Sequence, residues 1–224
     1  MRKRCLRRLG RLSYDRALEL QAELVAARKR GEIPDQLLLL EHAHVITLGR
    51  NGRMDNLLAR AEVLERGGIA FHETDRGGDI TYHGPGQLVG YPILDLREWK
   101  RDVGAYVRAI EQVLIDTVGC FGIGAGRIPG CTGVWVDGAK IAAIGVHISR
   151  WVTSHGFALN VNTDMSYFRY IVPCGLTKPV TSMAQLGVTA SLEEVSERLV
   201  EQFDRVFDFD SDRLSACPAG EERL

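Results

Sequence analysis

Three short segments carry residues that could do chemistry, and the last of them in the chain is Pro173-Cys174-Gly175. Proline fixes the backbone before the cysteine, and glycine leaves the thiol and the nearby amides uncovered. A turn of this kind could present a nucleophile. The alternative for a free cysteine is a small residue buried in the core.

The other two segments combine glycine or small residues with single polar side chains. Lys140-Ile141-Ala142-Ala143-Ile144-Gly145 is a strand of small and apolar residues opened by one lysine, which beside a turn is ordinarily solvated. Residues 76–87 read RGGDITYHGPGQ, and their four glycines allow a ligand to approach the backbone closely, or form tight turns between strands. This segment lacks the Gly-Lys-Ser/Thr of a phosphate loop and the G-x-G-x-x-G pattern, so nucleotide binding is poorly supported.

The elements that must position these segments follow from periodicity and capping residues. Ser13 predicts the start of a helix that ends at Gly31. Asp102 predicts the start of a second helix, whose apolar face continues to Val118, and the capping box Ser191-x-x-Glu194 predicts the start of a third. A further short helix is expected over residues 59–66. Strands are expected over residues 36–40, 45–48, 69–74, 80–82, 87–94, 134–136, 140–148 and 152–161.

Strands outnumber helices, and Asp137-Gly138 indicates a hairpin with a type I′ turn between two of them. The fold class is therefore α/β (α+β), with a mixed, largely antiparallel sheet flanked by helices, two of which cover one face. We expect one catalytic domain over residues 1–208 and a polar, loose tail over residues 209–224.

The composition excludes several classes of protein. A net charge of −1 and a pI of about 6.6 argue against nucleic-acid binding. Six basic residues within the first eleven form either a solvated strand or arm, which we favour, or a surface that steers an acidic partner. No apolar run spans a membrane, and five widely spaced cysteines indicate free thiols, so a cytoplasmic protein is expected.

Taken together and in this order, the segments resemble the lipoyl(octanoyl) transferase family, the LipB-type octanoyltransferases. The resemblance covers roughly residues 14–186. It rests on Glu41-His42, Thr47-Leu48-Gly49-Arg50, the block from Arg76 to Gln87, Gly133-Val134-Trp135-Val136, Lys140 to Gly145, Thr153-x-His155-Gly156-x-Ala158-Leu159-Asn160-Val161 and Pro173-Cys174-Gly175.

The resemblance implies a fold like the catalytic domain of biotin and lipoate protein ligases. It also implies that Cys174 is the acyl-thioester nucleophile and that Lys140 lowers the pKa of Cys174 and serves as a possible general acid or base. The implied substrate-binding residues are Arg76, Gly77, Gly78, Asp79, Ile80, Thr81, Tyr82, His83, Ala143, Ile144, Gly145, Gly156, Phe157 and Ala158.

The implied reaction moves octanoyl from octanoyl-acyl carrier protein to a lysine of a lipoyl domain. The acceptors would be the lipoyl domains of 2-oxo acid dehydrogenase complexes and the glycine cleavage H protein. No cofactor, metal, nucleic acid or membrane is expected. His83 and His155 should shape the pocket by hydrogen bonds, since no H-E-x-x-H or Cys/His array exists. Oxyanion donors could be the Gly175 amide or the backbone near Gly77-Gly78.

The chain departs from the family pattern where Ala43-His44 replaces the usual Pro-Pro, where Ile46 replaces a common tyrosine, and at Cys131, where arginine or histidine is frequent. These changes put local loop shape in doubt. Three other functions stay open: an ATP-dependent lipoate ligase of the same fold, a hydrolase that pairs Cys174 with His155 or His83, and a non-catalytic binding module.

Overall fold

Four consecutive leucines, residues 37–40, lie in strand β2 (Asp35–His42), and all four side chains are buried. Side chains alternate between the two faces of a strand, so a run of buried residues needs cover on both faces. The odd-numbered leucines pack into one hydrophobic cluster and the even-numbered leucines into another. The sheet that contains β2 is therefore the middle of three layers.

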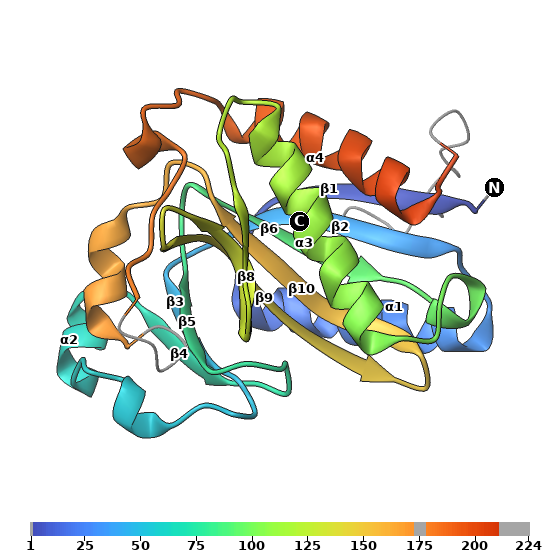
Figure 1. Ribbon diagram of the computed structural model, residues 1–224. Helices are drawn as coiled ribbons and strands as arrows, with labels where there is room; N and C mark the ends of the chain where they lie inside the picture. Colours follow the sequence, from blue (N-terminus) through green and yellow to red (C-terminus); the bar gives the residue numbers. More distant parts are fainter. Residues whose placement is uncertain (1, 173–177, 211–224) are drawn as a thin grey trace.

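The computed structural model describes residues 2–172 and 178–210 (Figure 1). β1 and β2 are parallel, and all other neighbours in the large sheet are antiparallel. The mixed, largely antiparallel sheet expected from the sequence is thus confirmed. The strand order is β1 (Arg4–Leu12), β2, β6 (Gln87–Ile93), β10 (Val152–Asn160), β9 (Ala139–Ser149), β8 (Cys131–Val136) and β7 (Gly126–Ile128).

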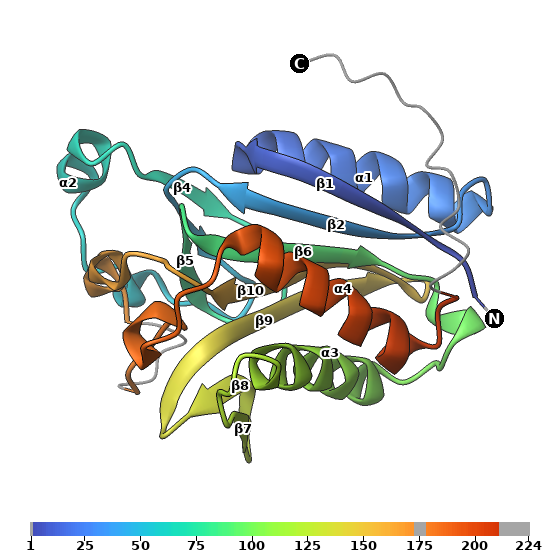
Figure 2. The same ribbon diagram turned by 90° about the horizontal axis from the view of Figure 1, so that it is seen from above.

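Helices α3 (Val103–Gly119) and α4 (Leu192–Phe207) cover one face of this sheet, as expected, and α1 (Tyr14–Arg30) covers the other (Figure 2). The hydroxyl or carboxylate oxygen of each expected N-cap accepts a hydrogen bond from a backbone N–H of the first turn. Asp137 and Gly138 have φ of 47° and 81°, as a type I′ turn between β8 and β9 requires.

A second, three-stranded sheet packs beside the large one, in the order β4 (Ala70–Glu73), β3 (Val45–Leu48) and β5 (Ile80–His83). Its hydrophobic core includes Leu64 of α2 (Ala61–Arg66) and Phe168. Short 3₁₀ helices span Met54–Asn56, Leu96–Glu98, Met165–Tyr170 and Ala184–Leu186. The sequence predicted the three strands of this sheet but not that they form a sheet of their own.

Most of the N-terminal basic cluster lies in an edge strand, β1, and one of its arginines, Arg4, is not solvated. Arg4 is 2% exposed and is paired through two nitrogens with Asp204 of α4. Cys5, also buried on β1, is disulfide-bonded, so the expectation of free thiols is wrong for Cys5. Phe209, the first residue of the expected tail, stacks on Phe203, and the Asp210 N–H donates to the Arg2 carbonyl at 3.1 Å. Within residues 2–172 and 178–210, no helix has the length and apolar character needed to cross a membrane.

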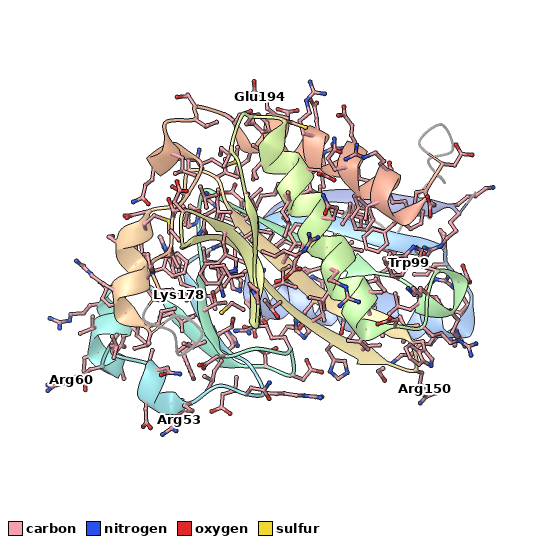
Figure 3. All side chains as sticks on the ribbon, in the orientation of Figure 1. Arg53, Arg60, Trp99, Arg150, Lys178 and Glu194 are labelled. Atoms are coloured by element: carbon pink, nitrogen blue, oxygen red, sulfur yellow. The ribbon has the colours of Figure 1, made fainter. Side chains whose placement is uncertain are left out.

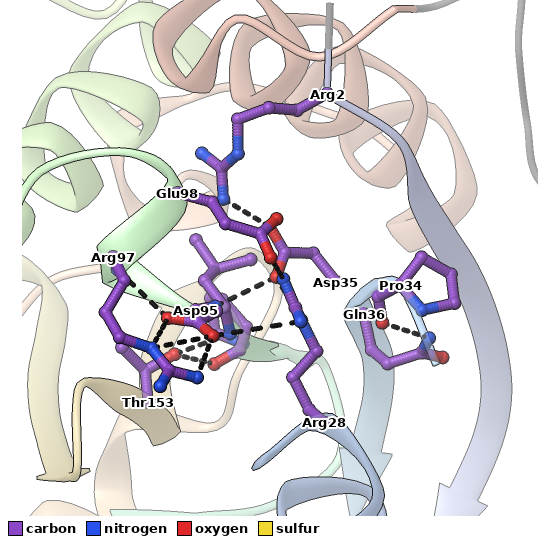
Figure 4. Close-up of polar contacts among 11 residues, drawn as sticks. Arg2, Arg28, Pro34, Asp35, Gln36, Asp95, Arg97, Glu98 and Thr153 are labelled. Atoms are coloured by element: carbon purple, nitrogen blue, oxygen red, sulfur yellow. Dashed lines mark hydrogen bonds and ion pairs between the residues drawn. The ribbon is translucent and has the colours of Figure 1, made fainter. Parts of the chain in front are cut away.

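A buried ionic cluster around Asp35 joins four parts of the chain (Figure 4). The Asp35 carboxylate accepts hydrogen bonds from Arg28 Nε at 2.9 Å, from the Asp95 backbone N–H at 2.9 Å and from Arg2. Arg28 also pairs with Glu98 at 2.7 Å. The cluster therefore ties the N-terminus and the end of α1 to β2 and to the segment after β6.

Replacing Asp35 should destabilise the fold strongly. Asp35→Ala removes the buried carboxylate that pairs with Arg28 Nε, and breaking a buried pair from one side typically costs about 3–5 kcal/mol. The free energy of unfolding from urea titration measures the loss. Glu32→Ala, which removes an exposed ion pair with Arg30, is the control and should change stability little. Equal effects in the two variants would contradict a structural role for the cluster.

His42 is a second buried polar residue that holds elements together. Its Nδ1–H donates to the Leu12 carbonyl at 3.0 Å, so its Nε2 accepts from the Tyr91 hydroxyl at 2.7 Å. Burial lowers the pKa of His42 to about 4. The folded protein thus holds this imidazole neutral at pH values where the unfolded chain protonates it.

This difference predicts acid sensitivity. Because the unfolded state binds a proton near pH 6.5 and the folded state near 4, the contribution of His42 is complete above pH 6.5 and is lost as the pH falls toward 4. The loss between pH 7 and 5 should be about 2 kcal/mol. In His42→Gln, whose amide can replace both hydrogen bonds, the unfolding free energy should depend less steeply on pH. An unchanged slope would contradict the assignment.

Candidate functional site

Two of the three segments singled out in the sequence, residues 76–87 and 140–145, meet at a cleft between the two sheets. Its volume is about 470 Å³, including the part open to solvent. All the predicted substrate-binding residues line it except Gly77 and Tyr82. The lining residues come from the loop before β5 and from β5 itself (Arg76, 78–81 and His83), from β9 (143–145) and from β10 (156–158).

The cleft exists because the strands that form its floor have almost no side chains there. Gly145 pairs with Gly156, and Ala143 pairs with Ala158, across β9 and β10. A Cβ atom on Gly145 would lie 2.7 Å from the carbonyl oxygen of Gly77. The Gly77 N–H donates to the Val146 carbonyl at 2.9 Å, which fixes the loop on β9 and removes this amide as an oxyanion donor.

Arg76 holds the same loop from its other side. Its guanidinium donates to the Thr47 carbonyl and hydroxyl oxygens of β3 at 2.7 and 2.8 Å, and the side chain is only 7% exposed. Asp79 accepts from its neighbouring backbone and from the Asn56 amide at 2.6 Å. These two residues therefore shape the cleft by positioning its backbone.

Tyr82 lies in the core of the small sheet rather than in the cleft. Its ring stacks on Tyr167 at a centroid distance of 5.0 Å, and its hydroxyl bonds His44 Nδ1 at 2.7 Å. His44 stands at one of the positions where the chain departs from the family pattern. The departure thus supplies a hydrogen-bond partner for Tyr82.

Lys140 lines a second, smaller cavity of about 290 Å³ that shares Thr81, Ala143 and Ala158 with the first. The lysine is 7% exposed, and its Nζ lies 4.8 Å from the centre of the Trp135 ring. Its backbone N–H donates to the Pro179 carbonyl at 2.9 Å. The two cavities therefore adjoin each other, and Lys140 lines only the smaller one.

Cys174 and the adjoining Pro173 and Gly175 lie outside the described residues. The chain on either side is fixed at the Lys140 cavity, since Phe168 before the gap and Val180 after it both line that cavity. The Val172 N–H donates to the Asn56 carbonyl at 2.8 Å.

A row of buried polar side chains borders the two cavities. His83 Nδ1 lies 2.7 Å from Gln87 Oε1, Gln87 Nε2 donates to Asn160 Oδ1 at 2.9 Å, and Asn160 Nδ2 donates to the Thr181 carbonyl at 2.9 Å. Burial, with a smaller effect of His42, lowers the pKa of His83 to about 3. His83 is therefore neutral at physiological pH.

His155 lies on the floor of the larger cleft with an unusual backbone, at a φ of 53°. Its Nε2 is 2.7 Å from Asp75 Oδ1, and burial lowers its pKa although Asp75 opposes the shift. Sequence reasoning missed Asp75, and it missed Tyr14 and Tyr91 of the lining, which look like core residues of amphipathic elements. In the described part of the chain, no cluster of three His, Cys, Asp or Glu side chains could hold a metal ion.

The geometry suits a slender, largely apolar ligand. A narrow, preformed cleft with apolar walls and few polar groups is typical of small-molecule sites. The ammonium of Lys140 at one end could stabilise a thiolate or interact with a reacting polar head group.

Comparison with known proteins agrees with this geometry. Residues 13–204 match the family model described as the lipoyl protein ligase A/B catalytic domain. Two relatives named octanoyltransferase, from Solibacter usitatus and Koribacter versatilis, are 72% and 56% identical, over 94% and 89% of this chain and 96% and 82% of their own lengths.

Solved structures share the fold at low identity. A lipoate-protein ligase A bound with ATP superposes with a TM-score of 0.76 at 16% identity, covering 93% of this chain and 87% of that one. A biotin protein ligase from Aquifex aeolicus has a TM-score of 0.52 at 10% identity, covering 93% and 70%. The chain belongs to the octanoyltransferases, a group of acyltransferases with the lipoyl protein ligase A/B catalytic domain.

Proposed function

We propose that this enzyme transfers octanoyl from octanoyl-acyl carrier protein to a specific lysine of lipoyl domains through a thioester on Cys174. The acceptors are the lipoyl domains of 2-oxo acid dehydrogenase complexes and the glycine cleavage H protein. The observation that carries the proposal is the pair of adjoining cavities. The larger one is an apolar cleft that suits an acyl chain, and the smaller one holds Lys140 together with Phe168 and Val180, which flank the segment that contains Cys174. The names of the relatives support the acyl group.

The proposed first step is thiolate attack on the carrier thioester. The bond from Cys174 sulfur to the acyl carbon forms, the bond to the carrier sulfur breaks, and the carrier thiol takes up a proton. One thioester replaces another at little free-energy cost. An ammonium near the thiol lowers the pKa of the thiol, which is the role proposed for Lys140.

The proposed second step is attack by the lysine amine of the lipoyl domain, which forms an amide and releases Cys174. A neutral Lys140 would accept the proton that the amine loses. Aminolysis of a thioester is downhill, so neither step requires ATP or a metal.

Two alternative reactions, ATP-dependent ligation and hydrolysis, can be distinguished from the proposed octanoyl transfer. A ligase would form an acyl adenylate and would need ATP, as the structural neighbour bound with ATP suggests for that protein. A hydrolase would use His83 or His155 as a base for water. Both histidines lie in the described cleft, but their lowered pKa values and existing hydrogen bonds favour positioning over proton transfer.

Intact-mass spectrometry tests the mechanism. Incubation with octanoyl-acyl carrier protein, without ATP, should add one octanoyl group to the wild type and none to Cys174→Ala. Adding apo lipoyl domain should move the group to the domain lysine. Absence of the adduct, or a need for ATP, would favour the ligase, and loss of the adduct to water without acceptor would favour the hydrolase.

Lys140→Ala should slow formation of the acyl-enzyme roughly tenfold or more at pH 7, because a thiol with an unperturbed pKa of about 8.5 is mostly protonated there. The deficit should shrink as the pH rises past that value. Lys178→Ala is the matched control, since the Nζ atom of Lys178 lies 5.2 Å from the centre of the same Trp135 ring. Figure 3 labels Lys178. An equal loss in both variants, or a deficit independent of pH, would contradict the electrostatic role.

The second role of Lys140 has its own measurement. Acylated Lys140→Ala, prepared at high pH, is mixed with the apo lipoyl domain, and the rate of octanoyl transfer is followed. Transfer should be slower than from the acylated wild type. An unchanged rate would rule out proton acceptance by Lys140.

A further inference from the structure

Lys140 and Ala143 both line the smaller cavity, although they lie three residues apart on one strand. Side chains alternate between the two faces of a regular strand, so residues three apart point to opposite faces. The two residues between them both pack in the hydrophobic cluster under α3 and α4. The alternation is therefore interrupted at this point, and the interruption turns Lys140 toward the cavity.

A β-bulge interrupts the alternation. In the register of β8 with β9, Val134 pairs with Ala142. The next residue, Trp135, pairs with Lys140 rather than with Ile141, which is therefore an extra residue of β9. Bulges of this kind re-aim a side chain and are common next to active sites. Without the extra residue, Lys140 would face α3 instead of the cavity.

The bulge places the lysine opposite a fixed aromatic ring. The Nζ atom of Lys140 lies 4.8 Å from the centre of the Trp135 ring. Trp135 is 3% exposed, and its Nε1–H donates to the Cys131 carbonyl at 3.1 Å. A cation over an aromatic face is attracted to the ring, and the attraction grows where little water reaches the pair. The ring therefore holds the ammonium group at a defined place.

Gly133 makes room for the stem of the same lysine. A Cβ atom on Gly133 would lie 3.3 Å from Cε of Lys140 and 2.7 Å from the carbonyl oxygen of Ala142. The glycine has a φ of 126°, a backbone conformation that favours glycine. Its N–H donates to Oε1 of Glu111, a buried residue of α3, at 3.1 Å. A backbone that α3 holds in place thus borders the lysine stem.

We propose that Gly133 and Trp135 are positioning residues for the reaction, which together with the β-bulge hold the Lys140 ammonium at one place in the smaller cavity. The lysine backbone is fixed as well, since its N–H donates to the Pro179 carbonyl and its carbonyl accepts from the Thr181 N–H, both at 2.9 Å. A lysine that is already ordered loses no rotamer freedom when it stabilises a thiolate. The inference deepens the proposed function and rests on it for the role of the ammonium group.

NMR spectroscopy of lysine side chains tests the placement without any reaction. In the wild type, the ring current of Trp135 should displace the Cε–H resonances of Lys140, assigned by their loss in Lys140→Ala, from those of exposed lysines. Trp135→Leu should abolish the displacement, and Trp135→Phe should retain part of it. Gly133→Ala, in which the new methyl group presses on the stem, should change it; where this strained variant does not fold, Trp135→Leu alone decides. Undisplaced Lys140 resonances in the wild type would overturn the proposal.

The effect on the reaction is measured as the pH dependence of Cys174 alkylation by iodoacetamide, whose midpoint gives the pKa of the thiol. The Cys174 peptide is followed by mass spectrometry, because Cys120 and Cys131 are also free. Trp135→Leu should move the midpoint upward, toward that of Lys140→Ala, and slow alkylation at pH 7 roughly threefold, the effect of one lost cation–π contact. Trp135→Phe, which keeps an aromatic face, should restore most of the rate.

Two controls separate positioning from loss of structure. Trp99→Leu removes another indole, which packs on Phe207 away from both cavities, and should leave the midpoint unchanged. Lys178→Ala removes the second ammonium near the Trp135 ring and should also leave it unchanged. In the Lys140→Ala background, Trp135→Leu should cause no further shift, because the ring acts through the ammonium group. An equal shift in both backgrounds would contradict the inference.

Failure of the positioning and failure of the proposed function give different results. A midpoint that rises in Lys140→Ala but not in Trp135→Leu would overturn the positioning role alone. Displaced Lys140 resonances that depend on Trp135, together with a midpoint that Lys140→Ala leaves unchanged, would contradict activation of Cys174 by Lys140 and leave the positioning supported.

Discussion

The site depends on the close approach of one loop to one strand. Residues 76–78 lie on β9, joined by the hydrogen bond from Gly77 to Val146, and Gly145 has no side chain to hold them apart. A Cβ atom at Gly145 would fall within 3 Å of a backbone oxygen, a contact that only movement of the loop could relieve. The small sheet and the large sheet meet through this contact, and the cleft lies between them.

The same constraint explains why the polar side chains of the site act chiefly as supports. Arg76 donates hydrogen bonds to Thr47, Asp79 accepts one from Asn56 in the segment after β3, and His83 is hydrogen-bonded to Gln87. Each bond fixes backbone or a neutral imidazole at the wall of a narrow space. A preformed wall binds a flexible chain without the entropic cost of ordering its own residues.

Local signals in the sequence predicted the elements well, because caps, turns and periodicity act within a few residues. Ser13, Asp102 and Ser191 cap helices as expected, and Asp137-Gly138 forms the hairpin turn. Long-range pairing was not predictable in this way. The parallel pairing of β1 with β2, the disulfide of Cys5 and the Asp75–His155 contact depend on segments that sequence spacing does not bring together.

For the site, family resemblance identified which segments meet, and the structure adds how polarity changes along the space they enclose. Lys140 lies at one end, small apolar residues follow along β9 and β10, and an imidazole held neutral by burial lies at the other end. In the proposed reaction the charge of Lys140 serves the reacting group, whereas a charge on His155 would oppose binding of an apolar chain. Burial of His155 beside Asp75 meets the second requirement, since burial keeps the imidazole uncharged while the hydrogen bond to the carboxylate fixes its tautomer.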